Sequence, residues 1–230
     1  MLAVGAIIAQ ALLREQRQVK TSAATESALA ALGGLRSLGA EIIWFRADRL
    51  QEEGRYVELS QLANALAYME PHTPEVWSYA AWNLAYNVSI MMPKPEDRWH
   101  WVDAAIRMLR DRGLKLNPGS KALLRELAWL FELKLGANLD IASPVYRQMW
   151  RKIVEDVRQR GAWEELGMDV RKMVEVEQAT GFDDWTDPQL SAIYWAVQGG
   201  HEDIFRQASA IYRRRHPQVQ KQFDIIHPNE

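Results

Sequence analysis

Apolar residues recur at spacings of three and four along most of the chain. An early run has this spacing at Ile43, Ala47 and Leu50, and a second run follows over 56–70. Such spacing places the apolar side chains on one face of an α-helix. Gly54, between the two runs, is typical of a helix C-terminus. The pattern therefore predicts two helices joined by a short turn.

Proline marks the points at which further helices begin. Thr73 is a favoured capping residue, and Pro74 suits the first position of a helix. The next helix follows at once, with an apolar face at Trp77, Ala80, Ala81 and Leu84. A third copy of the pattern starts after Pro118, with its apolar face at Leu124, Leu127, Ala128 and Phe131. The two prolines in 91–99 predict a loop there.

The C-terminal third continues in the same way. Ser143 and Pro144 open a predicted helix over 145–161, whose inward stripe is expected at Val145, Met149, Ile153 and Val157. Asp187 and Pro188 open a helix that ends at Gly199–Gly200. A last helix over 201–215 turns Ile204, Ala208 and Ile211 inward. No stretch alternates as a strand would, so the fold class is predicted to be all-α.

These paired helices resemble the tetratricopeptide repeat, a helical hairpin that recurs about every 34 residues. Counted from Ala40, the residues Gly54, Tyr56 and Pro71 occupy the repeat's glycine, tyrosine and proline positions. Counted from Pro74, the apolar face of the second copy matches as well. The resemblance implies antiparallel hairpins stacked as a short solenoid, with one concave face lined by the first helix of each repeat.

Three stretches are also similar to an uncharacterised group of bacterial tetratricopeptide-like proteins: WFRADRLQEEGRY, EPHTPEVWSYAAWNLAYN and LNPGSKALLRELAWLF. Members of that group carry a membrane segment before the repeats. The resemblance therefore implies that the start of this chain is an anchor at the inner membrane, on a side that the sequence leaves open.

The N-terminal apolar run, residues 2–13, is short for a membrane span. Twelve helical residues cover about 18 Å, against roughly 30 Å of hydrocarbon. Two interpretations stay open: a membrane-associated helix, or a helix docked on the chain's own core in a soluble cytoplasmic protein. The anchor residues in the first case are Leu2, Val4, Ile7, Ile8, Leu12 and Leu13.

Composition excludes several classes of chemistry. The 230 residues contain no cysteine, which rules out thiolate catalysis and cysteine-ligated metals. The net charge of −2 is unlike that of a general nucleic-acid binder. The five histidines have no paired ligand spacing, and no phosphate-binding glycine loop is present. Asp183–Asp184 and the run RRRHP at 213–217 are interpreted as a solvated surface and a helix end. We expect no enzyme, cofactor or metal.

The ten tryptophans suggest where a partner would bind. In the resembling repeats, the fifth and ninth positions of each first helix face the concave groove. Those positions hold Trp44, Asp48, Ser78, Trp82, Arg125 and Trp129. Asn83 and Asn87 could bond the bound segment or tie down a loop. Tryptophan is common both in cores and at binding hot spots, so packing of these rings on neighbouring helices is the competing interpretation.

The predicted organisation has three parts: an apolar helix and linker over 1–36, a repeat domain over 37–216, and a tail over 217–230. The leading hypothesis is a non-enzymatic scaffold or adaptor that binds a protein partner at a membrane or a membrane complex. The main alternative is a small-molecule or lipid binder with an aromatic pocket. An enzyme with residues spread over several helices is a third hypothesis.

Overall fold

The computed structural model of the protein describes residues 45–46, 49–50 and 52–218. The chain divides into two units, Met1–Arg49 and Leu50–Glu230, and the second unit is described below. The predicted anchor at 2–13, the groove residues Trp44 and Asp48, and the tail beyond residue 218 lie outside the described residues.

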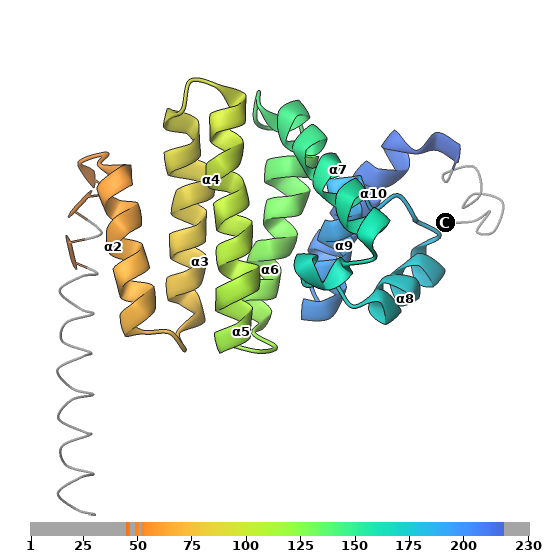
Figure 1. Cartoon of the computed structure of the whole chain (residues 1–230), viewed down its shortest axis with the longest axis horizontal. Helices are drawn as coiled ribbons and strands as arrows, with labels where there is room; N and C mark the ends of the chain where they lie inside the picture. Colours follow the sequence, from red (N-terminus) through yellow and green to blue (C-terminus); the bar gives the residue numbers. More distant parts are fainter. Residues whose placement is uncertain (1–44, 47–48, 51, 219–230) are drawn as a thin grey trace, which may run out of the picture. The chain divides into compact units, whose positions relative to one another are not determined.

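Every regular element in the described part of the chain is a helix, which confirms the all-α prediction. Several of these elements follow one another without a break, so that an α-helix passes into a π-helical segment. The elements in chain order (Figure 1) are α2 (Tyr56–Met69), α3 (Pro74–Trp82), η1 (Asn83–Val88), η2 (Ser89–Met91), α4 (Pro95–Arg107), η3 (Met108–Gly113), α5 (Leu114–Leu116), α6 (Lys121–Trp129), η4 (Leu130–Gly136), α7 (Ser143–Arg160), η5 (Trp163–Leu166), α8 (Val170–Thr180), α9 (Pro188–Gly199) and α10 (Glu202–Arg215).

The helix that begins at Pro74 starts as the sequence predicts. Thr73 is its N-cap residue and Pro74 occupies its first turn, although the Thr73 side chain makes no capping hydrogen bond. Trp77 is buried and its indole Nε1 donates to the carbonyl oxygen of Pro71 at 2.9 Å. The predicted inward face, with Ala80, Ala81 and Leu84, is also buried. The Trp77 contact fixes the turn that leads from α2 into α3.

The connection after η2 is shorter than the sequence predicts. A loop is expected over 91–99, but α4 begins at Pro95, and only three residues separate it from η2. Proline has a fixed φ that suits the first turn of a helix, so Pro95 starts the helix instead of prolonging the loop. Arg98 Nε donates to the carbonyl oxygen of Met92 at 2.7 Å and holds the turn closed.

The inward stripe of α7 is also different from the prediction. The residues expected inside, Val145, Met149 and Ile153, are only half-buried, whereas Val157 is buried as predicted. The core side of the helix is made instead by Tyr146, Trp150 and Val154, together with Val157. The two aromatic rings have the larger apolar surface, so the helix is turned by about one residue to bury them.

Helix α9 is the most enclosed element. All of its residues from Pro188 to Ala196 are buried, because it packs against α6, η4 and α10. The helix starts at the predicted cap, where an Asp187 carboxylate oxygen accepts from the backbone N–H of Gln189 at 2.9 Å. Gly200, with φ of 72°, ends it as predicted. The sequence pattern did not reveal α8, in which only Met173 and Val176 are buried.

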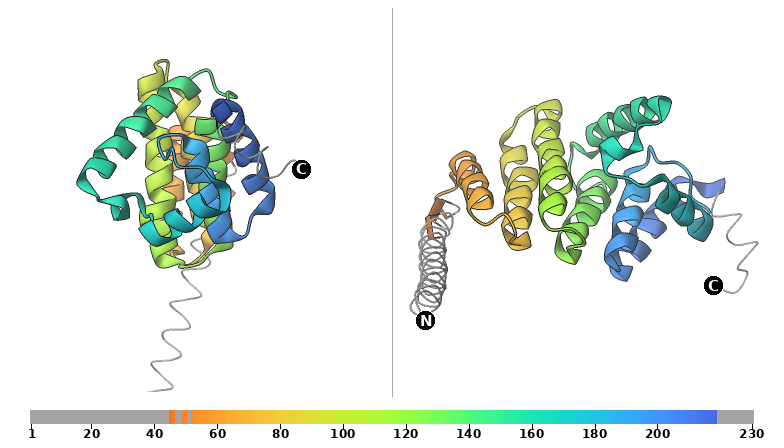
Figure 2. Two further views of the ribbon diagram at one scale, coloured as in Figure 1. Left: turned by 90° about the vertical axis from the view of Figure 1, so that its right-hand side faces the viewer. Right: turned by 60° about the horizontal axis from the view of Figure 1, so that its bottom comes forward.

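Neighbouring helices pack in a regular order. Helix α2 contacts α3, α3 contacts α6, and α6 contacts α9, while α4 contacts α7. Figures 1 and 2 show α2, α3, α4 and α6 side by side. Among the residues that the structure describes, none of the helices has the length and apolar character that crossing a bilayer requires.

Candidate functional site

A buried lysine forms the centre of the most complete polar cluster. Lys134 in η4 is only 4% exposed, and its Nζ lies 2.7 Å from Oδ2 of Asp140. The same oxygen accepts from the Tyr146 hydroxyl at 3.1 Å, and Arg98 lies 3.5 Å from the other oxygen of Asp140. A buried charge is costly unless it is paired and hydrogen-bonded, and here both charges are. The cluster joins η4 to α4 and α7.

The electrostatics of Asp140 reflect these partners. Burial acts to raise the pKa of Asp140, but the hydrogen bonds from Lys134 and from the backbone N–H of Ala142 outweigh it and hold the pKa below its usual value. Burial and the Asp140 charge raise the pKa of the Tyr146 hydroxyl. Asp140 is therefore ionised and Tyr146 neutral at physiological pH. The cluster is a fixed ion pair.

Two aromatic rings surround the lysine head. Nζ of Lys134 lies 5.1 Å from the centroid of the Tyr86 ring and 5.8 Å from that of Tyr146, within the range of cation–π attraction. Tyr86 in turn stacks on Trp82, with centroids 5.8 Å apart. Trp82 and Tyr86 thus form an aromatic strip that leads along α3 and η1 to the lysine.

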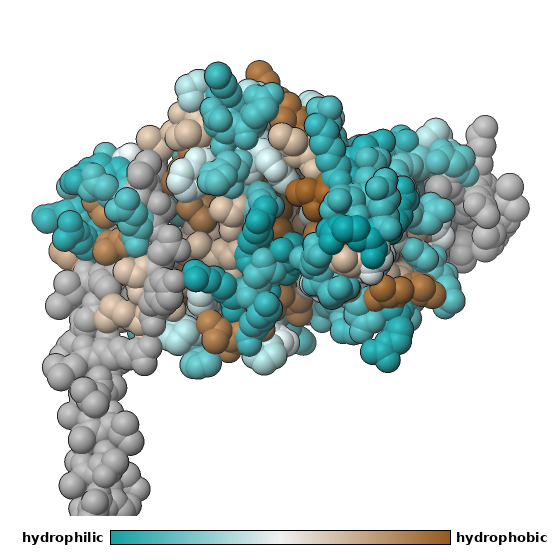
Figure 3. All heavy atoms as spheres, in the orientation of Figure 1, coloured by the Kyte–Doolittle hydropathy of each residue, from teal (hydrophilic) through white to brown (hydrophobic). Residues whose placement is uncertain are grey.

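A hollow of about 400 Å³ opens beside this cluster. We call it the Lys134 hollow; its lining is Tyr86, Ile90, Leu133, Lys134, Leu139, Asp140 and Ile141. Three apolar side chains at its rim are strongly exposed: Ile141 at 88%, Leu139 at 76% and Ile90 at 55%. Figure 3 shows hydrophobic surface at the upper edge of the molecule, where the loop before α7 lies in Figure 1. The hollow combines an apolar rim with a fixed polar floor.

The predicted groove residues are only partly at this site. Trp82 and Trp129 are 39% and 40% exposed, so both rings present surface to solvent. Trp82 reaches the hollow through its contact with Tyr86, whereas Trp129 is not part of the lining. Leu133, which is in the lining, follows Trp129 by about one turn of the same helix.

The other predicted residues serve contacts within the chain. Asn83 is fully buried, and its side-chain oxygen accepts from Nδ2 of Asn87 at 3.0 Å, so Asn83 cannot reach a partner on the surface. This bond joins two residues of η1, one helical turn apart. Arg125 pairs with Asp203 of α10 at 3.2 Å, and Ser78 is half-buried.

None of the residues that line the Lys134 hollow was among the partner-binding residues predicted from the sequence. Lys134 and Asp140 are separated by a helix end, and their pairing depends on the turn between them. Leu139 and Ile141 alternate in a short connection, without the spacing of a helix. Connections between helices are usually polar, so the apolar residues Leu139 and Ile141 in this connection are the sequence signal that could have indicated the hollow.

The described residues contain no group of histidine and carboxylate side chains that could hold a metal ion. Lys134 Nζ and Asp140 Oδ2 form an ion pair at 2.7 Å in the lining of the hollow. Comparisons with protein-family models, with curated proteins and with solved structures found no match to this chain.

Proposed function

We propose that this protein is a non-enzymatic scaffold or adaptor, and that the Lys134 hollow receives an apolar segment of a partner protein. The observation that carries the proposal is the exposure of Ile90, Leu139 and Ile141 around one hollow. Burying apolar surface is worth roughly 25 cal/mol per Å², so a partner that covers this rim gains binding free energy. Contiguous exposed apolar surface commonly marks an interaction site.

The charge of the floor determines the kind of anchor that fits. Asp140 neutralises Lys134 at 2.7 Å, and Arg98 lies against the same carboxylate. An acidic anchor would have to displace Asp140, and a basic one would meet two cations. An aliphatic or aromatic side chain disturbs neither ion pair. The partner segment therefore offers an uncharged apolar residue to the hollow.

The aromatic strip extends the proposed contact along η1 and α3. Trp82 is more than a third exposed and stacks on Tyr86, which lines the hollow. Tryptophan and tyrosine supply large, rigid contact areas and are enriched at binding hot spots. A segment anchored in the hollow would reach Trp82 if it ran toward the start of α3.

The alternative of a lipid or small-molecule binder with an aromatic pocket is less well supported. That hypothesis requires an enclosed cavity among the tryptophans. The Lys134 hollow has no tryptophan in its lining and is surrounded by exposed side chains. A rim of this kind suits a partner that covers it from outside.

The order of helix contacts, from α2 through α3 and α6 to α9, supports a stack of tetratricopeptide-like hairpins. Association with a membrane through residues 2–13 stays a prediction, because those residues lie outside the described part of the chain.

The test measures partner capture by a full-length chain in which two apolar residues at the rim of the Lys134 hollow are replaced by aspartate. Leu139→Asp and Ile141→Asp place a charge where the partner's apolar surface would lie, and both side chains are too exposed for the changes to affect folding. We expect the double variant to lose at least tenfold in partner recovery from the native host, which corresponds to about 1.4 kcal/mol. Quantitative mass spectrometry of the purified complexes measures the loss.

Val170→Asp is the matched control, since Val170 is 53% exposed on α8 and does not line the hollow. It should recover the partner as the wild type does, with equal helicity by circular dichroism. Unchanged recovery by the double rim variant would overturn the proposal. Loss of the partner only in a Trp82→Ala, Trp129→Ala variant would place the contact on the tryptophans instead.

A further inference from the structure

A second hollow, of about 380 Å³, lies between the start of α7, the start of α9 and the end of α10. It shares no lining residue with the Lys134 hollow. Its polar lining is unusually rich in cationic side chains. The lining residues are Pro144, Arg147, Gln148, Arg151, Asp184, Thr186, Asp187, Pro188, Arg215 and His216.

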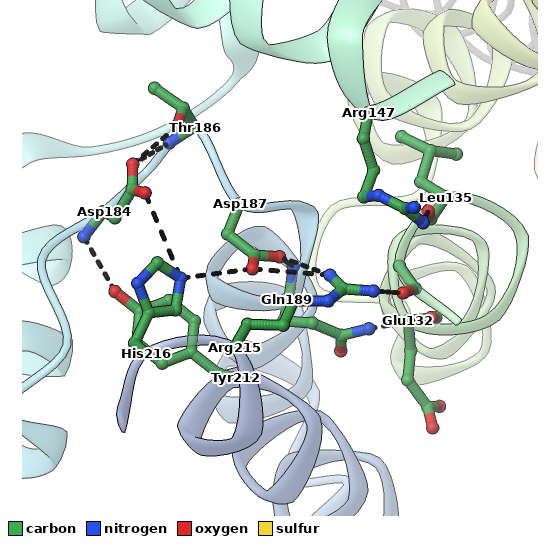
Figure 4. A network of polar contacts seen from close by, with 11 residues as sticks. Glu132, Leu135, Arg147, Asp184, Thr186, Asp187, Gln189, Tyr212, Arg215 and His216 are labelled. Atoms are coloured by element: carbon green, nitrogen blue, oxygen red, sulfur yellow. Dashed lines mark hydrogen bonds and ion pairs between the residues drawn. The ribbon is translucent and has the colours of Figure 1, made fainter. Parts of the chain in front are cut away.

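The two carboxylates of this hollow are already engaged by the protein. Asp187 is 7% exposed and accepts from the backbone N–H of Gln189, from Arg215 at 3.0 Å and from His216 Nε2 at 3.3 Å (Figure 4). Oδ1 of Asp184 accepts from the backbone N–H and the hydroxyl of Thr186, at 3.0 and 2.6 Å. Both carboxylates therefore accept hydrogen bonds from other groups of the protein.

The guanidinium groups are less fully engaged. Arg215 binds Asp187 and donates to the carbonyl oxygen of Gly136, and Arg147 donates to the carbonyl oxygen of Leu135 at 3.3 Å. Both arginines therefore donate to backbone carbonyl oxygens at the C-terminal end of η4 (Figure 4). A guanidinium has five N–H donors, so each keeps donors for another acceptor.

The balance of charge around the hollow is positive. Three guanidiniums, those of Arg147, Arg151 and Arg215, face two carboxylates, those of Asp184 and Asp187. Burial lowers the pKa of Arg147, and the nearby charge of Arg215 lowers it further. Neither Arg147 nor Arg151 forms an ion pair with a carboxylate among the described residues. An anion placed between Arg147 and Arg215 would relieve the repulsion between their charges.

We propose that this hollow binds the phosphoryl group of a small molecule through Arg147, Arg151 and Arg215. A phosphate monoester carries close to two negative charges near neutral pH and offers three acceptor oxygens. Planar guanidiniums bind such oxygens through paired N–H donors, better than lysine does. The volume lies within the range of small-molecule pockets, so an organic group can enter with the phosphate.

Calorimetric titration of the full-length chain tests the proposal, with inorganic phosphate and glycerol 3-phosphate as probes and chloride to hold the ionic strength constant. We expect both probes to bind. Arg151→Gln should weaken binding about tenfold, because a hydrogen bond to a charged group is worth about 1.5 kcal/mol or more. Arg147→Gln should weaken it at least as much.

Arg158→Gln is the matched control, because Arg158 is exposed on the same helix and does not line the hollow. It removes the same charge and should leave both affinities within twofold of the wild type. Arg151 is exposed, so its variant keeps the fold, which thermal unfolding verifies. Absence of binding by either probe, or equal weakening by Arg151→Gln and Arg158→Gln, would overturn the proposal.

Discussion

Two carboxyl groups of this protein, those of Asp140 and Glu132, have pKa values shifted in opposite directions. Lys134 and Asp140 are buried as a bonded pair, and the pKa of Asp140 is held below its usual value. Glu132, two residues before Lys134 in η4, is 2% exposed, and burial followed by the charge of Asp203 raises its pKa from 4.5 to about 7. The folded state therefore favours the charged form of Asp140 and the neutral form of Glu132.

The raised pKa of Glu132 predicts a loss of stability as the pH rises. Between pH 4.5 and 7 the unfolded chain has released this proton while the folded chain still holds it, so the free energy of unfolding falls across that window. The full effect is on the order of 3 kcal/mol. Urea unfolding at pH 5 and pH 8 measures it in the wild type and in Glu132→Gln.

In Glu132→Gln the side chain keeps its size but cannot ionise. The variant should be close to the wild type at pH 5 and exceed it by more at pH 8, because the difference grows as the pH rises from 4.5 to 7. Equal pH dependence in the two proteins would show that Glu132 is not the group responsible. Asp140 acts in the other direction, since its contribution is present above its unfolded pKa and is lost in acid below about pH 4.

At the scale of elements, three of the helices change from α-helical to π-helical geometry along their length. Each of the helices that begin at Pro74, Pro95 and Lys121 passes into a π-helical segment, namely η1, η3 and η4. A π-helical segment widens the helix and often accompanies a functional site. Tyr86 of η1 and Lys134 of η4 lie in two of these segments and meet at the Lys134 hollow.

Close approach of two elements explains the glycine at the end of η4. A Cβ on Gly136 would lie 2.0 Å from Nε2 of Gln189, whose amide donates to the carbonyl oxygen of Glu132 at 3.0 Å. The same Cβ would lie 2.7 Å from the backbone carbonyl oxygen of Phe131, so no side chain fits at Gly136. Glycine here allows the buried part of helix α9 to lie against η4.

The burial of the helices predicts how their amides exchange with solvent. Helix α9 is buried along nine consecutive residues, from Pro188 to Ala196, whereas α8 buries only Met173 and Val176. Local opening is easiest where few apolar contacts hold an element. Hydrogen exchange followed by mass spectrometry should therefore show strong protection of α9 and early exchange of α8. Equal protection of both helices would contradict this account of their packing.

At the scale of the whole molecule, each helix depends on its neighbours. Helix α6 contacts α3 on one side and α9 on another, and α4 contacts α7. An amphipathic helix cannot bury its apolar face alone, so neighbouring helices share one core. Side chains near a helix end have fewer neighbours to cover them. The Lys134 hollow lies at the C-terminal end of η4.

Membrane association is the prediction that concerns the chain as a whole. Residues 2–13 are apolar apart from Gln10 and precede the basic residues Arg14, Arg17 and Lys20. Cells that express the full chain should yield it in the membrane fraction. Deletion of residues 1–20 should release it to the soluble fraction, and a deleted chain that still sediments with membranes would exclude this anchor.

Much of the helical pattern could be predicted from the sequence. The starts at Pro74 and Pro188 and the end at Gly200 depend on capping and on proline, which act within a few residues. The rotation of α7 could not be predicted, because the stripe that starts at Val145 and the stripe that starts at Tyr146 compete for the core, and only the neighbouring helices decide between them. Helix α8 was missed because its buried face holds just two side chains.

The sequence by itself determined that the part of the chain described by the structure is helical, since apolar spacing and helix ends are local properties. Only the tertiary structure decided which side chains meet. Tyr86 and Lys134 come together through the packing of separate helices, and Arg215 reaches the carbonyl oxygen of Gly136 across 79 positions of the chain. Local rules say nothing of such distant pairs, because their positions depend on how whole helices pack. Both proposed binding sites are built from pairs of this kind.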